Sequence, residues 1–544
     1  MFADLIFVNG VIRTMADGIA RAVAVRDGRI VAVGADTDVT PLIGESTEVV
    51  DLAGRALLPG FQDSHVHPVL AGLTMIRCDL HDARDADEAL ELIAAYAAAH
   101  PEQEWIGGGG WSMDWFPGGT PARGLLDAIV PDRPIHLINQ DGHGAWVNTE
   151  ALQMCGVDAE TRDPQDGRIE READGYPQGT LHEGAAHLVG DHLPEPTPDD
   201  LLRALRAGQE RLHSVGVTAW QDAMVSPEVQ RAYESAAAAG ILTGRVVGAL
   251  WWDRERGAEQ IPELIERRRA TGRFRTTSVK IMQDGVAENF TAAMTSSYLD
   301  GCGCGTGNHG LSFVDPIALR DHVTRLDAAG FQVHIHAVGD RAAREALDAF
   351  ARAREVNGRN DNRHHIAHLQ VVHPEDVPRF AALDITANMQ PLWAAYEPAM
   401  NDLTIPFLGP ERAEWQYPFG ELHRTGAPLA AGSDWPVSSA DPLLGIHVAV
   451  NRSIPGEPYD VFLPHQCLDV TTAFTAYTLG TARVNHLESD TGTIEVGKYA
   501  DLVVLDRDPF TEPGRILEAA VVATYVEGRQ VYSRLPDRKP VHTA

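Results

Sequence analysis

The stretch LLPGFQDSHVHP, residues 57–68, is an apolar run that a Pro-Gly pair interrupts and that ends on two histidines one residue apart. In a β-strand, side chains at positions i and i+2 point to the same face. His65 and His67 therefore share a face if this run is a strand, and two imidazoles on one face can bind one metal ion. Two hydrogen-bonded structural histidines are the alternative, and the rest of the chain has to decide between them.

Strand-like apolar runs alternate with Ala-, Leu- and Arg-rich helical stretches such as 198–216 and 341–358 through most of the chain. This alternation predicts parallel strands joined by crossover helices. Eight strands are expected, the number that an α/β fold of the (β/α)8 or TIM barrel type requires. They cover residues 57–65, 216–223, 245–252, 277–284, 331–338, 364–372, 384–391 and 428–435.

Both ends of the chain lack the strand–helix alternation of the middle and consist of short β-rich runs. Residues 5–15 and 22–34 contain Asn-Gly and Asp-Gly between β-rich runs, which is typical of hairpins, and residues 501–509 and 520–533 have a similar β-rich texture. Neither end has enough strands to be stable alone. We therefore expect one composite β-sandwich from residues 1–58 plus 490–544, and a barrel over residues 59–489.

The interval between the first two barrel strands is unusually long. It spans roughly 140 residues, several times a normal connection. We predict an inserted subdomain at about residues 85–195. An insertion after a barrel strand lies at the catalytic face, where it can form a lid or a substrate wall. Its Gly-rich run at 105–119 is not a phosphate loop, because no Gly-Lys-Ser/Thr follows.

Composition limits the class of partner. The chain has 544 residues and a net charge of −32, which disfavours nucleic acid because phosphate binding requires basic patches. No apolar run reaches the length of a membrane span, and the first residues lack the basic start of a secretory signal. We expect a cytoplasmic protein with no membrane partner, a small-molecule substrate and a possible homodimer.

The five cysteines are too few and odd in number for a disulfide framework. Cys302 and Cys304, in GCGCGTGNHG (301–310), leave two interpretations open. They could form a soft metal site with His309, or belong to a Gly-rich loop. Structural zinc sites usually have four ligands at Cys-x2-Cys-like spacing, which favours the loop.

Polar side chains that suit a metal occur on five of the eight expected strands. Active sites of this fold lie at the carboxyl ends of the strands, so these side chains are expected around one axis. Each alone has a structural interpretation, such as a hydrogen-bonded core histidine or a turn aspartate, but the joint pattern favours a site. The candidates are His65 and His67 on the first strand, Lys280 on the fourth, His334 and His336 on the fifth, His364, His365 and His368 on the sixth, and Asp434 on the eighth.

Lys280 is the most unusual of these residues, because a core-facing ammonium in an apolar strand is costly. Burial lowers the pKa of a lysine and so favours the neutral amine. A neutral amine can react with carbon dioxide to give a carbamate, an anion that is able to bridge two metal ions. The position of Lys280 therefore favours a binuclear site.

The ordered set resembles the amidohydrolase superfamily, and more narrowly amidohydrolase family 3, the branch with YtcJ-like proteins and N-substituted formamide deformylases. The motifs that carry the resemblance are LLPGFQDSHVHP, DGHGAWVN (141–148), VKIMQDG (279–285), HIHAVGDRA (334–342), RHHIAHLQVV (363–372), GSDWPV (432–437) and TGTIEVGKYADLVVLD (491–506). Each motif alone is weak, but their order is specific and covers nearly the whole chain.

The resemblance implies a binuclear centre with two divalent ions, zinc being the default for nitrogen and oxygen ligands. His65, His67 and Asp434 would hold one ion, His336 and His368 the other, and carboxylated Lys280 would bridge them. The implied reaction is hydrolysis of an amide-type C–N bond by a metal-bridging hydroxide, with Asp434 as the catalytic residue that transfers the proton. His334 and His364 are expected to be structural or to support the ligands.

Substrate contacts are less visible. We predict His143 and Trp146, in DGHGAWVN, to face the pocket from the insertion, although this stretch could equally be a turn that docks the subdomain. Glu183 is a further candidate. Trp111, Trp115 and Trp393 suggest an aromatic-lined cavity, though tryptophans also serve in ordinary core packing.

Two alternatives remain open from the sequence. One is a deaminase of heterocycles, but mononuclear deaminases of this superfamily do not need the lysine on the fourth strand. The other is a non-catalytic relative that acts as a scaffold or regulator. Such relatives usually lose metal ligands, whereas all six are present here.

Overall fold

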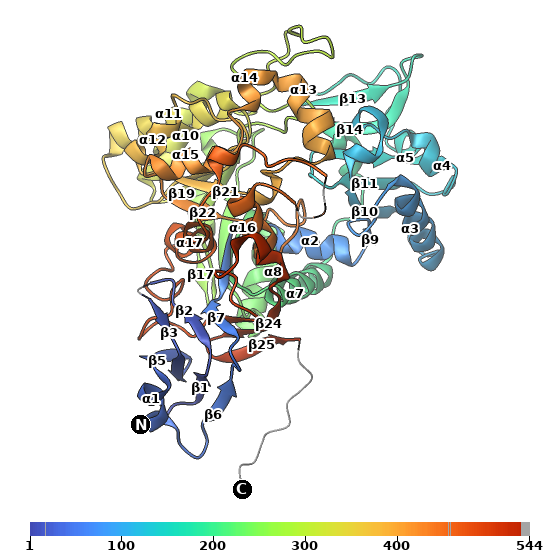
Figure 1. Cartoon of the computed structure of the whole chain (residues 1–544). Helices are drawn as coiled ribbons and strands as arrows, with labels where there is room; N and C mark the ends of the chain where they lie inside the picture. The colour runs from blue at the N-terminus through green and yellow to red at the C-terminus, as the bar shows by residue number, and fades with distance from the viewer. Residues whose placement is uncertain (17, 455, 457, 535–544) are drawn as a thin grey trace.

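The computed structural model describes residues 1–16, 18–454, 456 and 458–534 (Figure 1). Its centre is a barrel of eight parallel strands, in the order β22-β21-β20-β19-β18-β16-β15-β8. This confirms the predicted α/β barrel. The strands are β8 (Phe61–Val66), β15 (Val217–Val225), β16 (Arg245–Trp251), β18 (Phe274–Met282), β19 (Gln332–Ala337), β20 (His365–His368), β21 (Thr386–Met389) and β22 (Leu429–Ala431).

Helices that follow the strands cover the outside of the barrel. Side-chain caps start several of them: Thr197, Ser226 and Asp315 each accept a backbone N–H from the first turn of the helix that follows. These helices are α7 (Pro198–Ser214), α8 (Pro227–Ala238), α9 (Ile261–Arg267), α10 (Pro316–Ala328), α11 (Asp340–Asn357), α12 (Val377–Leu383) and α15 (Phe419–Arg424). No helix among the described residues has the length and apolar content to cross a bilayer.

The first and last barrel strands meet through backbone hydrogen bonds at their carboxyl ends. The N–H of Asp434 donates to the carbonyl of His65 over 2.7 Å, and the N–H of His67 donates to the carbonyl of Trp435 over 2.9 Å. The segment after β22 therefore runs beside the end of β8. This places Asp434 directly against the two histidines of the opening motif.

The opening motif differs from the prediction in one respect. Residues 57–65 are not one strand, because β7 (Ala56–Pro59) belongs to another sheet and β8 starts after Gly60. A Cβ on Gly60 would lie 2.4 Å from the Thr218 hydroxyl oxygen, so the chain can pass between the two sheets only with glycine at this point. The Pro-Gly pair is thus a boundary between sheets.

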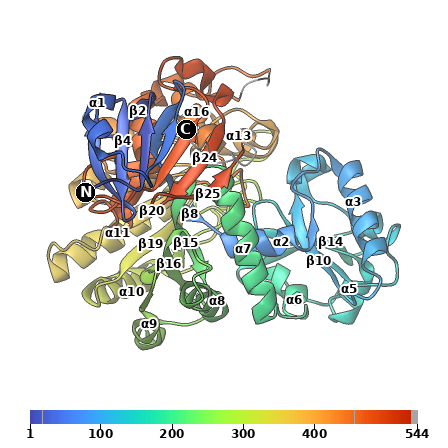
Figure 2. The same cartoon turned by 90° about the horizontal axis from the view of Figure 1, so that it is seen from below.

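Strands from both ends of the chain lie side by side below the barrel in the view of Figure 1, and Figure 2 shows them next to each other. One sheet has the order β25-β24-β23-β7-β2-β3, and a second has the order β5-β4-β1-β6. Phe7, Val25, Leu57, Leu502 and Tyr525, from both sheets, belong to one buried apolar cluster. The domain bounds stay a prediction. The strands are β1 (Leu5–Val8), β2 (Val11–Arg13), β3 (Ile19–Ala20), β4 (Ala22–Arg26), β5 (Arg29–Gly34), β6 (Glu48–Asp51), β23 (Leu502–Leu505), β24 (Val521–Val526) and β25 (Arg529–Ser533).

The segment between β8 and β15 forms a second sheet to one side of the barrel, in the order β13-β14-β12-β11-β10-β9 (Figures 1 and 2). Helix α2 (Pro68–Met75) starts directly after His67 and packs closely on α7, where Gly72 faces the backbone of Ala204. The insertion is thereby held at the carboxyl end of β8. Its elements are β9 (Cys78–Asp79), β10 (Ile106–Trp111), β11 (Ile135–Asn139), β12 (Gly144–Val147), β13 (Gly167–Arg171), β14 (Pro177–Glu183), α3 (Ala86–Ala99), α4 (Arg123–Asp127) and α5 (Thr149–Met154).

Candidate metal centre

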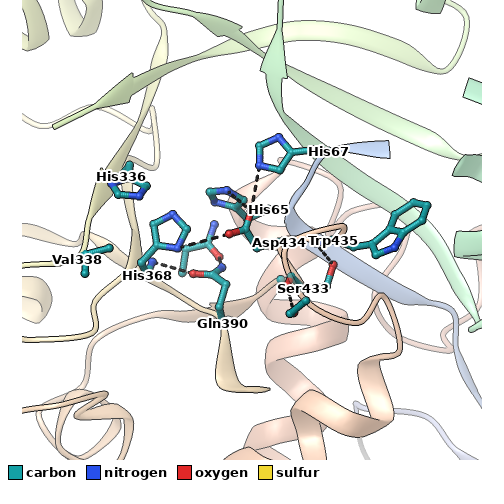
Figure 3. Close-up of polar contacts among 12 residues, drawn as sticks. His65, His67, His336, Val338, His368, Gln390, Ser433, Asp434 and Trp435 are labelled. Atoms are coloured by element: carbon teal, nitrogen blue, oxygen red, sulfur yellow. Dashed lines mark hydrogen bonds and ion pairs between the residues drawn. The ribbon is translucent and has the colours of Figure 1, made fainter. Parts of the chain in front are cut away.

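The structure brings the six predicted metal ligands together in and just after the carboxyl-terminal halves of the barrel strands. Figure 3 shows the imidazoles of His65, His67, His336 and His368 gathered around Asp434. All but His67 are at most 5% exposed, so the cluster lies in a buried setting where charges and lone pairs need partners. The ligands are His65 on β8, His67 just after it, Lys280 on β18, His336 on β19, His368 on β20 and Asp434 after β22.

One half of the cluster is built around the Asp434 carboxylate. The Nε2 atoms of His65 and His67 lie 3.1 and 3.0 Å from the same oxygen, Oδ1. Burial alone would raise the pKa of Asp434, but the two imidazoles hold it well below its usual range. Asp434 also has a left-handed backbone, with φ of 58°. An ionised carboxylate between two imidazoles is a donor set suited to a divalent ion.

His368 provides the clearest sign that these residues suit a metal ion. Neither ring nitrogen has a hydrogen-bond partner among the described residues, although the side chain is buried. Its backbone is held in the left-handed region, with φ of 77°, and its N–H donates to Gln390 Oε1 over 2.7 Å. One donor atom each from His368, His65 and Asp434 lies within 4.8 Å of the others. Because buried polar atoms are normally paired, these donors fit a metal ion.

His336 is oriented by a carboxylate. Its Nδ1 lies 3.1 Å from Asp284 Oδ1, and Asp284 accepts further N–H groups from Val338 and Gly339. This leaves Nε2 as the ring nitrogen available to a ligand, in the manner of carboxylate–histidine–metal arrangements. The rings of His336 and His368 are 4.2 Å apart, centre to centre. Asp284 was not among the predicted site residues, although it is the last residue of the predicted strand.

Lys280 lies within the same cluster. Its side chain is 3% exposed, and Nζ is 3.4 Å from Nε2 of His65. Burial lowers the pKa of Lys280 to about 7, although Asp434 opposes this shift. No ion pair of Lys280 occurs within the described part of the chain. A substantial fraction of neutral amine is therefore present near neutral pH, as carboxylation requires.

Supporting residues hold the ligands in place. Nε2 of His334 lies 3.0 Å from Nδ1 of His65, and Nδ1 of His334 lies 2.7 Å from Gln221 Oε1. This network turns Nε2 of His65 toward the site. Asp63, which was not among the predicted site residues, accepts the N–H groups of His65 and Ser433 and so joins β8 to the Asp434 segment. An aspartate two residues before a ligand gives no separate sequence signal.

His364 belongs to a different part of the barrel. Its Nε2 pairs with Asp327 over 2.9 Å, its Nδ1 accepts the N–H of Val333, and its ring stacks on Phe350. Both ring nitrogens of His364 therefore have partners, and none of these partners is a proposed metal ligand. His364 is therefore structural, one of the two roles expected for it.

A cavity of about 500 Å³ opens on the cluster. It is bounded by the insertion, by the barrel loops and by the segment after β21. His143 and Trp393 line it, as does Trp115. Of the described residues that line it, none is Lys or Arg. Its other lining residues include Asp114, Asp141, Glu288, His336, His368, Glu397, Tyr417 and Asp434.

Three predicted substrate residues do not line this cavity. Trp111 and Trp146 are fully buried in the apolar core of the insertion, where their indole N–H groups donate to the carbonyls of Leu137 and Ala122. Glu183 lies behind His143. The expectation that these side chains contact substrate is corrected for Trp111 and Trp146, because core packing uses their whole surface.

The cysteine loop is separate from the metal ligands. Cys302 and Cys304 are exposed free thiols. Within the described residues, the group of His, Cys, Asp and Glu side chains that could hold a metal contains neither of them, nor His309. The loop interpretation is the one that the structure favours.

Comparisons with known proteins agree with this geometry. The profile of the family described as "Amidohydrolase family" matches residues 48–532. Protein LONG AFTER FAR-RED 3 of Arabidopsis thaliana is 32% identical over 97% of this chain and 92% of its own length. The putative amidohydrolase YtcJ of Bacillus subtilis is 30% identical over 97% and 99%. The N-substituted formamide deformylase of Arthrobacter pascens is 28% identical over 98% of both chains.

A solved structure shows the same fold. The uncharacterized metal-dependent hydrolase of Pyrococcus horikoshii has a TM-score of 0.74 and 26% identity, and the match covers 94% of this chain and 99% of that one. The resemblance found in the sequence motifs is thus confirmed by a profile over most of the chain and by near full-length relatives. The chain belongs to the amidohydrolase family.

Proposed function

We propose that this protein is a metal-dependent hydrolase that cleaves an amide-type C–N bond. The leading substrates are N-substituted formamides, other N-acyl amines and cyclic amides. The observation that carries the proposal is Lys280, an amine buried among four imidazoles and the Asp434 carboxylate with no acidic ion-pair partner of its own in the described structure. The deformylase of Arthrobacter pascens, similar along the whole chain, supports the choice of substrate.

The ligand set divides between two divalent ions, with zinc as the first candidate. His65, His67 and Asp434 would hold one ion, His336 and His368 the other, and a carbamate on Lys280 would join them. Ions bound here supply Lewis acidity, which polarises a carbonyl oxygen and lowers the pKa of water.

Asp434 carries the proton transfer. It is ionised, buried and on the cavity wall, so it can accept a proton from the attacking water and pass it to the leaving nitrogen. Trp393 and Trp115 give the cavity aromatic walls that suit an apolar amine or acyl group.

The deaminase alternative is disfavoured by Lys280, which a mononuclear deaminase site does not need. The scaffold alternative is disfavoured by the complete ligand set and by the orphaned ring nitrogens of His368. A direct test is to assay the zinc- or manganese-loaded enzyme against a panel of N-alkylformamides, N-acetylamines, cyclic imides and aminoheterocycles. Formate or carboxylate release from amides supports the proposal, and ammonia release from aminoheterocycles alone refutes it.

The charge on the cavity wall predicts a substrate preference. Asp114, Asp141 and Glu288 line the cavity, and none of its lining residues in the described part of the chain is Lys or Arg. We expect neutral or cationic amides to be hydrolysed at least about 10-fold more efficiently than carboxylate-bearing amides of the same length, since like charges repel strongly in a partly buried site. Measuring kcat/KM for N-formylpentylamine and N-formyl-5-aminopentanoate compares a neutral with an anionic chain. A higher kcat/KM for the anion would contradict the prediction.

A further inference from the structure

A histidine–glutamate pair joins the insertion to the cavity. Nδ1 of His143 lies 3.0 and 3.1 Å from the two carboxylate oxygens of Glu183, and the N–H of Glu183 donates to the carbonyl of His143 over 2.9 Å. His143 precedes β12, and Glu183 ends β14. The two residues are thus fixed to each other by both backbone and side chain.

The barrel holds the Glu183 carboxylate from its other side. Oε1 accepts the hydroxyl of Thr291 over 2.6 Å and the amide of Asn289 over 3.3 Å. These two residues lie in the loop that follows β18, the strand of Lys280. A Cβ on Gly285, in the same loop, would lie 2.3 Å from Oε1. The loop is therefore shaped around this carboxylate.

The backbone of Glu183 is strained. Its φ of 52° with ψ of −129° is a conformation that side-chain-bearing residues rarely adopt. Such strain persists where the surroundings fix the residue, often at functional sites. The strain brings the carboxylate under His143, whose ring lines the cavity.

The pair leaves one ring nitrogen of His143 free to donate into the cavity. Burial alone would lower the pKa of His143, but the charge of Glu183 raises it to about 9. Burial alone would likewise raise the pKa of Glu183, whereas His143 lowers it to about 2. Since Nδ1 faces Glu183, Nε2 is the ring nitrogen left to donate. The ring lies 5.7 Å from that of His336, centre to centre.

We infer that His143 donates a hydrogen bond from Nε2 to the acyl oxygen of the substrate and stabilises the negative charge that develops there, while Glu183 is the positioning residue that fixes its tautomer and direction. The inference rests on the proposed function. It gives the insertion a catalytic task, because a donor fixed before the reaction costs no reorganisation when the charge forms. Among the described residues that line the cavity, none is Lys or Arg, and the imidazole of His143 offers an N–H donor apart from the proposed metal ligands.

The chain contains a matched control. His182, on β14, is 2% exposed and its Nε2 lies 3.1 Å from Glu170 Oε1, but neither residue lines the cavity. His143→Gln, Glu183→Gln and His182→Gln therefore each remove one member of a histidine–glutamate pair in the same sheet. Only the first two changes affect the proposed donor.

The first readout is turnover of 4-nitroformanilide, which releases a coloured amine, with metal content measured on the same samples. We expect His143→Gln to lower kcat by about 10²–10³-fold, the usual effect of removing one oxyanion donor. Glu183→Gln should lower kcat by about 10-fold or more with KM changed less than about threefold, since it acts through His143. His182→Gln should stay within about threefold of wild type, and metal content should stay equal in all four proteins.

The second readout does not need turnover. Phenylphosphonate carries charged oxygens around a tetrahedral centre, and its affinity for the metal-loaded proteins can be measured by calorimetry. We expect His143→Gln to bind phenylphosphonate at least about 10-fold more weakly than wild type does. His182→Gln should bind it with the affinity of wild type. Wild type could fail to hydrolyse 4-nitroformanilide while His143→Gln still binds phenylphosphonate more weakly. That result would count against the proposed function but support the role of His143 as a donor.

Two outcomes overturn the inference. One is phosphonate affinity within threefold of wild type in both His143→Gln and Glu183→Gln. The other is a metal-loaded wild type that does not bind phenylphosphonate at all. If His143→Gln does not fold, the same test is made on Glu183→Gln, which keeps the size of the side chain. Its phenylphosphonate affinity is then compared with that of wild type.

Discussion

Asp434→Asn is expected to lower kcat by about 10³-fold or more and to reduce the metal content of the purified protein. Asparagine keeps the shape of the side chain but loses the charge that two imidazoles surround at 3.0 and 3.1 Å. The amide is a weaker metal ligand and cannot accept the proton of the attacking water. Both losses act on the same reaction, so the effect on kcat should exceed that of losing one oxyanion donor.

Asp327→Asn provides the control for this change. Asp327 is also buried and paired with a histidine, His364, but these contacts lie away from the metal ligands. We expect Asp327→Asn to lower the melting temperature and to leave metal content and kcat within about threefold of wild type. Steady-state kinetics and metal analysis on the three proteins check both expectations. Full metal content and kcat within tenfold of wild type in Asp434→Asn would contradict the role given to Asp434.

Lys280→Met is expected to abolish activity while it stabilises the metal-free protein. Methionine has similar length, replaces an amine that is 3% exposed, and cannot form a carbamate. Because burying an ammonium without an ion-pair partner is unfavourable, an apolar side chain of similar volume should stabilise the metal-free fold. Loss of the bridging ligand should lower kcat by about 10³-fold or more. A gain in stability together with a loss of activity would show that Lys280 serves the reaction and not the fold.

The pH dependence of this stabilisation has a fixed sign. Burial lowers the pKa of Lys280 to about 7 in the folded, metal-free chain, against 10.5 in the unfolded chain. Between these values the unfolded chain binds more protons, so the free energy of unfolding of wild type rises with pH. The advantage of Lys280→Met should therefore be largest below pH 7 and shrink toward pH 10. Urea unfolding of the two metal-free proteins at pH 6.5 and 9 measures this difference in the free energy of unfolding. A larger difference at pH 9 than at pH 6.5 would contradict the prediction.

Much of the fold could be predicted because it depends on local patterns. The alternation of strand and helix segments located all eight barrel strands, and the HxH spacing placed His65 and His67 at the end of the first. The break at Gly60 was missed because it depends on Thr218, which is distant in the sequence and crowds the glycine only in the folded barrel. Local patterns do not contain such contacts.

The ligands were easier to predict than the cavity wall. Lys280 stands out because an amine in an apolar strand needs a reason, whereas a tryptophan in an apolar strand does not. Trp111 and Trp146 therefore could not be told apart from Trp115, which does line the cavity. Asp63 and Asp284 were missed because they act through backbone N–H groups of segments far along the chain.

The proposed lysine-bridged pair of metal ions can be tested by measuring metal content per chain. Plasma mass spectrometry is run on wild type and Lys280→Met side by side. We expect about two ions in wild type and a clear fall to about one or fewer in the variant, because the bridging ligand is lost. One ion in wild type that the substitution leaves unchanged would contradict the bridge and favour a mononuclear site. No metal in either protein, after purification with zinc or manganese, would contradict the hydrolase mechanism altogether.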